Sequence, residues 1–210
     1  QTVREGTLAN ALIVDTAEEL AGLSDSEIQQ AAELAAEKGA PGKYALALQN
    51  APQQPVLAAL TNRETRERLF QASLARSSKG GELDTRTMLA RIAALRAQKA
   101  SLFGKPDWAT YTMYDRMAKQ PSAALGFMQQ MVPALSATQR NEADLLNEKI
   151  AEEGKNFTVQ PWDWYLYANK VKAEQYAIDE DEIAGYFQLE KVLEDGVFYM
   201  ANKLYGVTFE

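Results

Sequence analysis

The sequence predicts a mainly α-helical protein: an array of several helices with long antiparallel members and at most one short strand, near residues 44–48. Apolar residues recur at helical spacing through most of the chain. Capping residues, glycines and prolines stand where such helices should begin and end. No segment repeats with a period of about 20–50 residues, so a solenoid is not indicated.

The first third of the chain contains two helix signals and one strand signal. Ser24 and Glu27 form a capping-box pattern for a helix that Gly39 brings to an end. Residues 44–48 alternate large and small apolar side chains, which is typical of a short strand. Asn62 is the expected N-cap of a second helix.

The middle of the chain predicts two further helices. Residues 78–81 (Ser-Lys-Gly-Gly) form the clearest loop of the sequence. Asp84 or Thr85 caps the helix after it, and Gly104 ends that helix. A shorter helix is expected over residues 108–114.

The longest helix is expected in the last part of the chain. Pro121 fits its first turn, where the missing amide hydrogen costs nothing, and Gly154 ends it. Another helix is expected to begin at Pro161, and a last one covers about residues 189–204. Residues 206–210 have the composition of a strand that is just starting.

No shift in composition marks an interdomain linker, so residues 1–210 are predicted to form a single helical region, with the loop at 78–81 as a sub-boundary. The chain opens without methionine and ends on a strand-like segment that has no partner strand. We therefore expect a fragment of a larger protein. Helix faces around Phe198, Tyr199 and Leu204 would then be exposed and prone to self-association.

The composition excludes several classes of enzyme. The 210 residues include no cysteine and no histidine. The chain therefore contains no disulfide, thiolate metal site, catalytic triad or histidine-based zinc helix. A metal bound by this chain would need oxygen ligands, which favour magnesium or calcium.

The charge distribution argues against nucleic acid as a partner, because the net charge is -7 and phosphate binding requires clustered cations. Glu64 and Glu67 alternate with the one group of basic residues, which predicts a solvated, ion-paired helix face. That group consists of Arg63, Arg66, Arg68 and Arg76. No apolar run approaches the roughly 20 residues that span a bilayer.

Three groups of residues are candidates for chemistry, and each has a favoured structural interpretation. Asp163 lies between two tryptophans, which could raise its pKa for acid–base work, but a carboxylate here is better explained as a helix cap. The acidic run at residues 179–182 lacks the spacing of a calcium loop and favours capping and solubility. Aromatic residues that could stack ligands favour core anchoring; they are Trp162, Trp164, Tyr165 and Tyr167.

Several motifs in order resemble bacterial peptidyl-dipeptidases (dipeptidyl carboxypeptidases) of the thimet oligopeptidase family of zinc metallopeptidases. They are NRETRERLF at residues 62–70, LRAQKASLFG at 95–104, RMAKQP at 116–121, PWDW at 161–164 with Tyr167, YFQLE at 186–190, GVF at 196–198 and ANKLYG at 201–206. Each motif is modest by itself, but their order along nearly the whole chain is specific.

The resemblance implies part of a larger, two-lobed helical peptidase that removes dipeptides from the C-termini of short, unstructured peptides. The family's HExxH zinc helix and glutamate ligand would lie C-terminal to this chain, so zinc is expected in the full-length parent and no cofactor in this chain. No residue here is assigned a catalytic, cofactor-binding or metal-binding role. The expected partners are short peptides and the remainder of the parent chain, without nucleic acid or membrane. The expected location is the cytoplasm, with the periplasm as an alternative.

The leading hypothesis is a non-catalytic helical portion of such a peptidase, which forms part of the wall of its substrate channel and is inactive alone. The first alternative is a stand-alone helical binding or scaffold protein derived from the family. The second is an enzyme that uses a carboxylate-bound metal.

Overall fold

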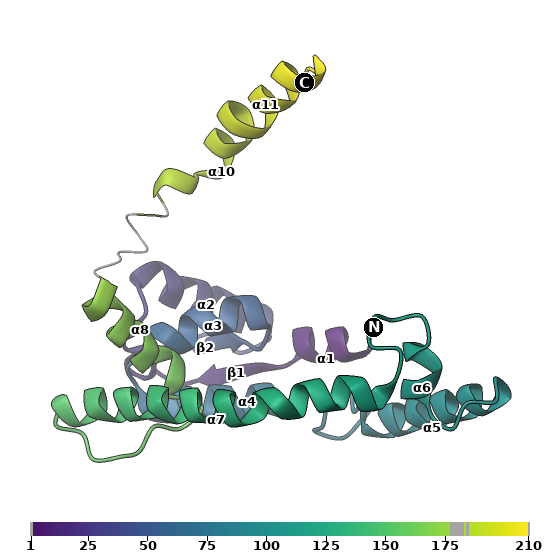
Figure 1. Cartoon of the computed structure of the whole chain (residues 1–210). Coiled ribbons are helices and arrows are strands. Elements are labelled where there is room, and N and C mark those ends of the chain that lie inside the picture. The colour runs from purple at the N-terminus through teal and green to yellow at the C-terminus, as the bar shows by residue number, and fades with distance from the viewer. Residues whose placement is uncertain (1, 177–182, 184, 210) are drawn as a thin grey trace. The chain divides into compact units, whose positions relative to one another are not determined.

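The computed structural model describes residues 2–176, 183 and 185–209. The described chain is mainly helical, as predicted, and forms two compact units (Figure 1). The first unit comprises residues 1–169 and the second residues 170–210. The loop at residues 78–81 lies inside the first unit.

A two-stranded antiparallel sheet lies in the first unit, after the short helix α1 (Thr2–Ala9). The predicted strand at residues 44–48 is confirmed as β2 (Tyr44–Ala47). Its partner β1 (Ala11–Val14) was not predicted, and it pairs with β2 so that Leu12 lies opposite Leu46. A short apolar run such as Ala-Leu-Ile-Val does not by itself distinguish a strand from a helix.

The connection between the strands contains a short 3-10 helix, η1 (Ala17–Leu20), and helix α2 (Asp25–Glu37). The predicted capping box of α2 is present. The Ser24 hydroxyl accepts from the Glu27 amide, and the Glu27 carboxylate accepts from the Ser24 amide at 2.8 Å. Two backbone donors at the start of the helix are thereby satisfied.

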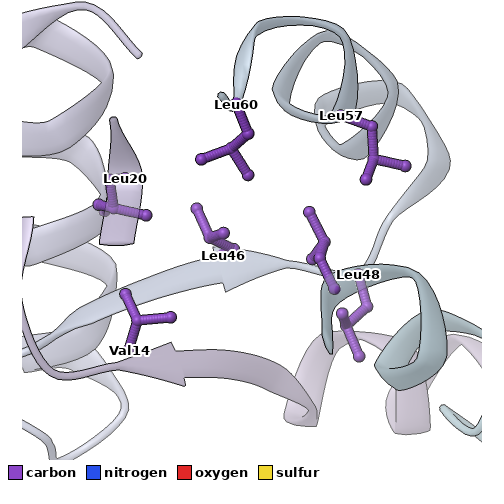
Figure 2. Close-up of a cluster of buried hydrophobic side chains, with 8 residues drawn as sticks. Val14, Leu20, Leu46, Leu48, Leu57 and Leu60 are labelled. Carbon is purple, nitrogen blue, oxygen red and sulfur yellow. The ribbon is translucent and has the colours of Figure 1, made fainter. Parts of the chain in front are cut away.

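The apolar core of the first unit lies between the sheet and helices α2, α3 (Asn50–Ala59) and α4 (Arg63–Leu74). Figure 2 shows the side chains of its centre pointing toward one another from the strands and the helices around them. The buried members of this core are Val14, Leu20, Ala31, Leu46, Leu48, Leu57, Leu60 and Leu69. Burial of apolar surface of this kind supplies most of the stabilisation of a fold.

A close approach of two backbones joins the connection between the strands to the end of α3. The Thr61 amide donates to the Ala21 carbonyl at 2.7 Å. Gly22 has a φ of +100°, and a Cβ there would lie 2.2 Å from the carbonyl oxygen of Ala59. Glycine is therefore required at position 22.

Helix α4 begins where predicted, because the side chain of Asn62 accepts from the Thr65 amide at 3.1 Å. Its buried face includes polar residues in addition to Leu69. The Ser73 hydroxyl donates to the side-chain carbonyl of buried Gln53 at 3.0 Å, which ties α4 to α3. The hydrogen bond offsets the cost of removing these polar groups from water.

The first of the next two helices lies mostly in solvent, whereas the second is partly buried along its length. Helix α5 (Arg86–Leu102) is exposed at every residue from 86 to 99. Helix α6 (Trp108–Met113) packs on it, with Lys99 lying 5.7 Å above the Trp108 ring. Both helices agree with the sequence prediction in type and position.

The long helix α7 (Pro121–Glu152) has a buried face only in its last turns, at Leu146 and Ile150. It ends as predicted before Gly154, which has a φ of +71°. Helix α8 (Trp164–Tyr176) follows after a loop and a turn, so it begins three residues later than predicted.

After the last turns of α8, the described part of the second unit consists of short helical segments. The helix predicted over residues 189–204 is present as α10 (Leu189–Lys191), a π-helical segment η3 (Val192–Phe198) and α11 (Tyr199–Tyr205), preceded by η2 (Gly185–Phe187). Of the three residues expected to be exposed, Tyr199 and Leu204 are 59% and 64% exposed, whereas Phe198 is only partly exposed.

The strand suggested for residues 206–210 is absent from its described part, 206–209, so that prediction was wrong there. Phe209 instead stacks on Phe198 with ring centroids 4.2 Å apart. The side-chain amide of Asn202 donates to the Val207 carbonyl at 3.2 Å. With no second strand among its described neighbours to supply a ladder, the segment folds back on its own helix.

Candidate functional site

A buried ionic cluster joins α4 to the turn that precedes α8. The carboxylate of Asp163, with no exposed surface, accepts from the Arg66 guanidinium at 2.8 Å and from the Arg63 guanidinium at 2.9 Å. The Gln160 amide donates to the same carboxylate at 3.2 Å. Arg66 is 1% exposed and also donates to the Leu60 carbonyl at 2.8 Å. A buried charge is tolerable only with partners of this kind.

Aromatic rings cover the outer side of this cluster. The Arg63 guanidinium lies 4.1 Å above the Phe157 ring and 5.7 Å from the Trp162 ring. Trp162 in turn packs against Phe70 of α4, with centroids 6.1 Å apart. Arginine stacks well on such rings, since its planar cation is weakly hydrated. The rings therefore cover part of the Arg63 guanidinium, whose side chain remains 34% exposed.

These contacts correct the prediction for the arginine group, which does not form a solvated face paired with its own helix. Arg66 is buried against a residue 97 positions away. Arg68 pairs with Glu19 and donates to the Ile13 carbonyl, so it ties α4 to β1. Arg76 donates to the Ser73 hydroxyl at 2.9 Å. The alternation with Glu64 and Glu67 gave no sign of these distant partners.

A second polar group holds the loop between α7 and α8. The ammonium of Lys155 donates to Glu153 at 2.7 Å and to the Tyr167 hydroxyl at 3.0 Å. These hydrogen bonds raise the pKa of Lys155. The Val159 amide donates to the side chain of Asn147 at 2.8 Å. The loop is thus anchored to both helices.

The aromatic candidates divide into buried and partly exposed residues. Tyr167 is fully buried, as core anchoring predicts, whereas Tyr165 is 41% exposed. Beside Tyr165 and Trp164 is a cavity of about 580 Å³, lined also by Phe70 and Pro161, with Arg140 as its one cation. This cavity offers apolar contacts but no nucleophile or free carboxylate. Its composition suits binding rather than bond cleavage.

Among the described residues, the candidates for acid–base and metal chemistry do not gather into a reactive centre. The lone pairs of Asp163 are occupied by two arginines and a backbone amide, so this carboxylate has a structural role. It was favoured as a helix cap, and it does accept one turn amide. The acidic run at residues 179–182 lies outside the described residues. Within the part of the chain that is described, no three His, Cys, Asp or Glu side chains gather as metal ligands would.

Comparison with known proteins identifies the family. Residues 56–210 match the sequence profile of the family described as "Peptidase family M3". The chain belongs to peptidase family M3. The match confirms the resemblance on which the sequence interpretation rested.

Individual M3 relatives match the chain along its full length. It is 44% identical to the dipeptidyl carboxypeptidase of Salmonella typhimurium over 209 residues, which cover 100% of this chain and 31% of that protein. It is 42% identical to the Escherichia coli dipeptidyl carboxypeptidase, covering 96% of this chain and 30% of the relative. Oligopeptidase A of Escherichia coli is 29% identical over 98% of the chain and 31% of its own length. The chain thus spans about a third of these relatives.

The structure gives the M3 motifs a physical meaning. Arg63 and Arg66 belong to the NRETRERLF motif, and Asp163 belongs to the PWDW motif. These motifs are about a hundred residues apart in sequence, yet they meet in the buried ionic cluster and in the Phe70–Trp162 contact. Sequence reasoning identified both motifs but not their contact. Opposite charges in two motifs of one family were the signal that could have revealed it.

The described residues also bear on the membrane. Among them, no helix combines the length and the apolarity needed to cross a lipid bilayer.

Proposed function

We propose that this M3 chain is a non-catalytic helical portion of a zinc metallopeptidase that releases C-terminal dipeptides from short peptides. The observation that carries the proposal is the 44% identity to a dipeptidyl carboxypeptidase from one end of the chain to the other. The identity to oligopeptidase A, at 29%, is much lower. The comparison therefore favours dipeptide release over the activity of that relative.

In this proposal the chain forms part of the wall of the substrate channel, and residues 1–210 belong to one helical region of the parent. Long helices and a rigid ionic cluster suit a wall that limits which peptides enter and that excludes water from the cleft. Short unstructured peptides and the remainder of the parent are the partners. The cytoplasm is the proposed location, with the periplasm as the alternative.

Zinc belongs to another part of the parent in this proposal. The described residues of this chain do not fit the metal, because they offer neither imidazole nor a group of three ligating side chains. No step of the reaction is therefore derived through this chain, and none of its residues is proposed as a zinc ligand or catalytic base. Its contribution is to bind and position.

A chimera tests the proposal. Residues 1–210 replace the matched segment of the Salmonella dipeptidyl carboxypeptidase, and release of dipeptides from a blocked tetrapeptide is measured with and without a zinc chelator. The chimera is expected to retain chelator-sensitive activity. A folded but inactive chimera would contradict the proposal and favour a stand-alone helical binding or scaffold protein.

The isolated chain provides the matching control. Incubated with zinc and the same tetrapeptide, residues 1–210 alone are expected to show no cleavage above background. Chelator-sensitive cleavage by the isolated chain would overturn the non-catalytic role. Tight magnesium or calcium binding in calorimetry would instead support the carboxylate-metal alternative.

A further inference from the structure

Helix α5 packs against little of the first unit. Every residue from 86 to 99 is exposed, and burial begins only at Ala100. An isolated helix of this length is marginally stable in water, since most helical stability comes from packing of an apolar face. Within the first unit, α5 packs mainly on the short helix α6 (Figure 1).

An apolar stripe runs along α5 nonetheless. Ile92 and Leu95 follow Met88 by four and seven residues, which places all three on one side of the helix. They are 47%, 37% and 45% exposed in the order Met88, Ile92, Leu95. Leu102 continues the stripe at 85% exposure. Exposed apolar side chains in a row can pack against another apolar surface, although Leu89, 58% exposed, lies outside this row.

The charge of α5 is opposite to that of the protein as a whole. Residues 86–102 contain four cations and no carboxylate, although the net charge of the chain is -7. Arg86 pairs with Asp84 in the loop before the helix. Within the described residues, the other three cations form no ion pair. They are Arg91, Arg96 and Lys99.

Two of these three cations border the apolar stripe, and the third, Lys99, lies within it. Arg91 precedes Leu95 by four residues, and Lys99 follows it by four, so both lie one helical turn from it. Arg96 lies one turn after Ile92 and 5.5 Å from the Trp108 ring of α6. Packing of the stripe would therefore bring Arg91 and Arg96 to opposite edges of the contact and Lys99 into the contact itself.

We propose that α5 docks on an apolar surface bordered by carboxylates, in the part of the peptidase outside residues 1–210. This inference rests on the proposed function. Two observations support the occupant: the chain matches only 31% of the length of its Salmonella relative, and carboxylates on a docked surface would complement the three cations, which form no ion pair among the described residues. Two copies of this chain joined stripe to stripe would instead bring like charges together.

Amide hydrogen exchange tests the proposal, read by mass spectrometry on residues 88–100 of the isolated chain and of the chimera. Exchange in the chimera is expected to be at least about tenfold slower, because docking removes local opening. Buried α4 serves as the internal control and should be protected in both proteins. Equal exchange of α5 in the two proteins would overturn the proposal.

Charge reversal tests the chemistry of the partner surface. In the chimera, Arg91→Glu is expected to accelerate the exchange of α5 several-fold, whereas Lys38→Glu, an equal change of charge at the end of α2, should leave it unchanged. The milder Arg91→Gln should give an intermediate result and serves if the reversal prevents folding. Identical exchange in the Arg91 and Lys38 variants would overturn the carboxylate border.

The outcomes separate this inference from the proposed function. An active chimera with unprotected α5 counts against the docking of α5 alone. A folded, inactive chimera with protected α5 counts against the proposed function alone. If light scattering shows that the isolated chain is a dimer and its α5 is protected there, the occupant is a second copy and the proposal is wrong.

Discussion

The first structural unit contains one region in which leucines are buried and another in which they are exposed. Around the sheet and helices α2 to α4, Leu60 and Leu69 have no exposed surface. On α5 and the first half of α7, Leu102 and Leu135 are 85% and 57% exposed. Both regions have helical apolar spacing, so periodicity alone does not reveal which helix has a partner. The leucines of the sheet region thus have packing partners within the described chain, whereas those of α5 and the first half of α7 face solvent.

The stability of the sheet region depends strongly on the ionic cluster. We expect Asp163→Asn to lower the free energy of unfolding by about 3–5 kcal/mol. The variant leaves Arg66, 1% exposed, without a counter-charge. Urea unfolding followed by circular dichroism measures the change.

The control for this prediction is Asp15→Asn. Asp15 also pairs with a cation, Lys43, at 2.7 Å, but both side chains are more than half exposed. Exposed pairs contribute little because solvent screens them, so no measurable change is expected. Equal effects of the two substitutions would show that burial does not set the strength of the cluster.

A pair of identical truncations tests the comparison directly. In the isolated chain, Leu69→Ala is expected to cost about 2–5 kcal/mol of unfolding free energy, since it leaves a cavity in the core. Leu95→Ala, at a position 45% exposed, should cost about 0.5 kcal/mol or less. Thermal or urea unfolding of both variants provides the measurement. A large loss for Leu95→Ala would mean that α5 already has a partner in the isolated chain.

Local features of the fold were largely predictable from sequence because their causes are local. The capping box at Ser24, the cap at Asn62 and the helix end at Gly154 each depend on residues a few positions apart. The strand at residues 44–48 was also recognisable, from its alternation. The π-helical turn inside the last helix had no recognised signal.

Contacts between distant segments were not predictable from one sequence. Strand β1 exists because it pairs with β2. No local sequence pattern indicates that Leu12 lies opposite a residue of β2. The partners of Arg63 and Arg66 lie 100 and 97 residues away, so the alternating charges of α4 suggested the wrong neighbours. The family resemblance supplied function where local physics did not, because it depends on the order of motifs rather than on contacts.

The smallest effect on stability is expected at Asp84, in the loop that joins the sheet region to α5, and this effect depends on pH. Hydrogen bonds to the Asp84 carboxylate hold its pKa well below its ordinary value of 3.8. The Arg86 guanidinium makes the largest contribution, and the backbone amides of Arg86 and Gly80 add to it. The folded protein therefore favours the ionised carboxylate. Its contribution to stability is fully present above pH 3.8, declines below that value, and is lost once the pH has fallen through the lower folded pKa.

We expect the urea midpoint of Asp84→Asn to lie below that of the unmodified chain by a constant amount from about pH 7 to pH 5, and the gap to narrow as the pH falls below about 4. In an Arg86→Gln background the gap should shrink at neutral pH, because the largest cause of the shift is gone. A gap of constant size down to about pH 2 would show that the Asp84 carboxylate does not anchor the loop before α5. That loop connects the sheet region to α5, so a confirmed gap would mean that the Asp84–Arg86 pair fixes the first residue of α5.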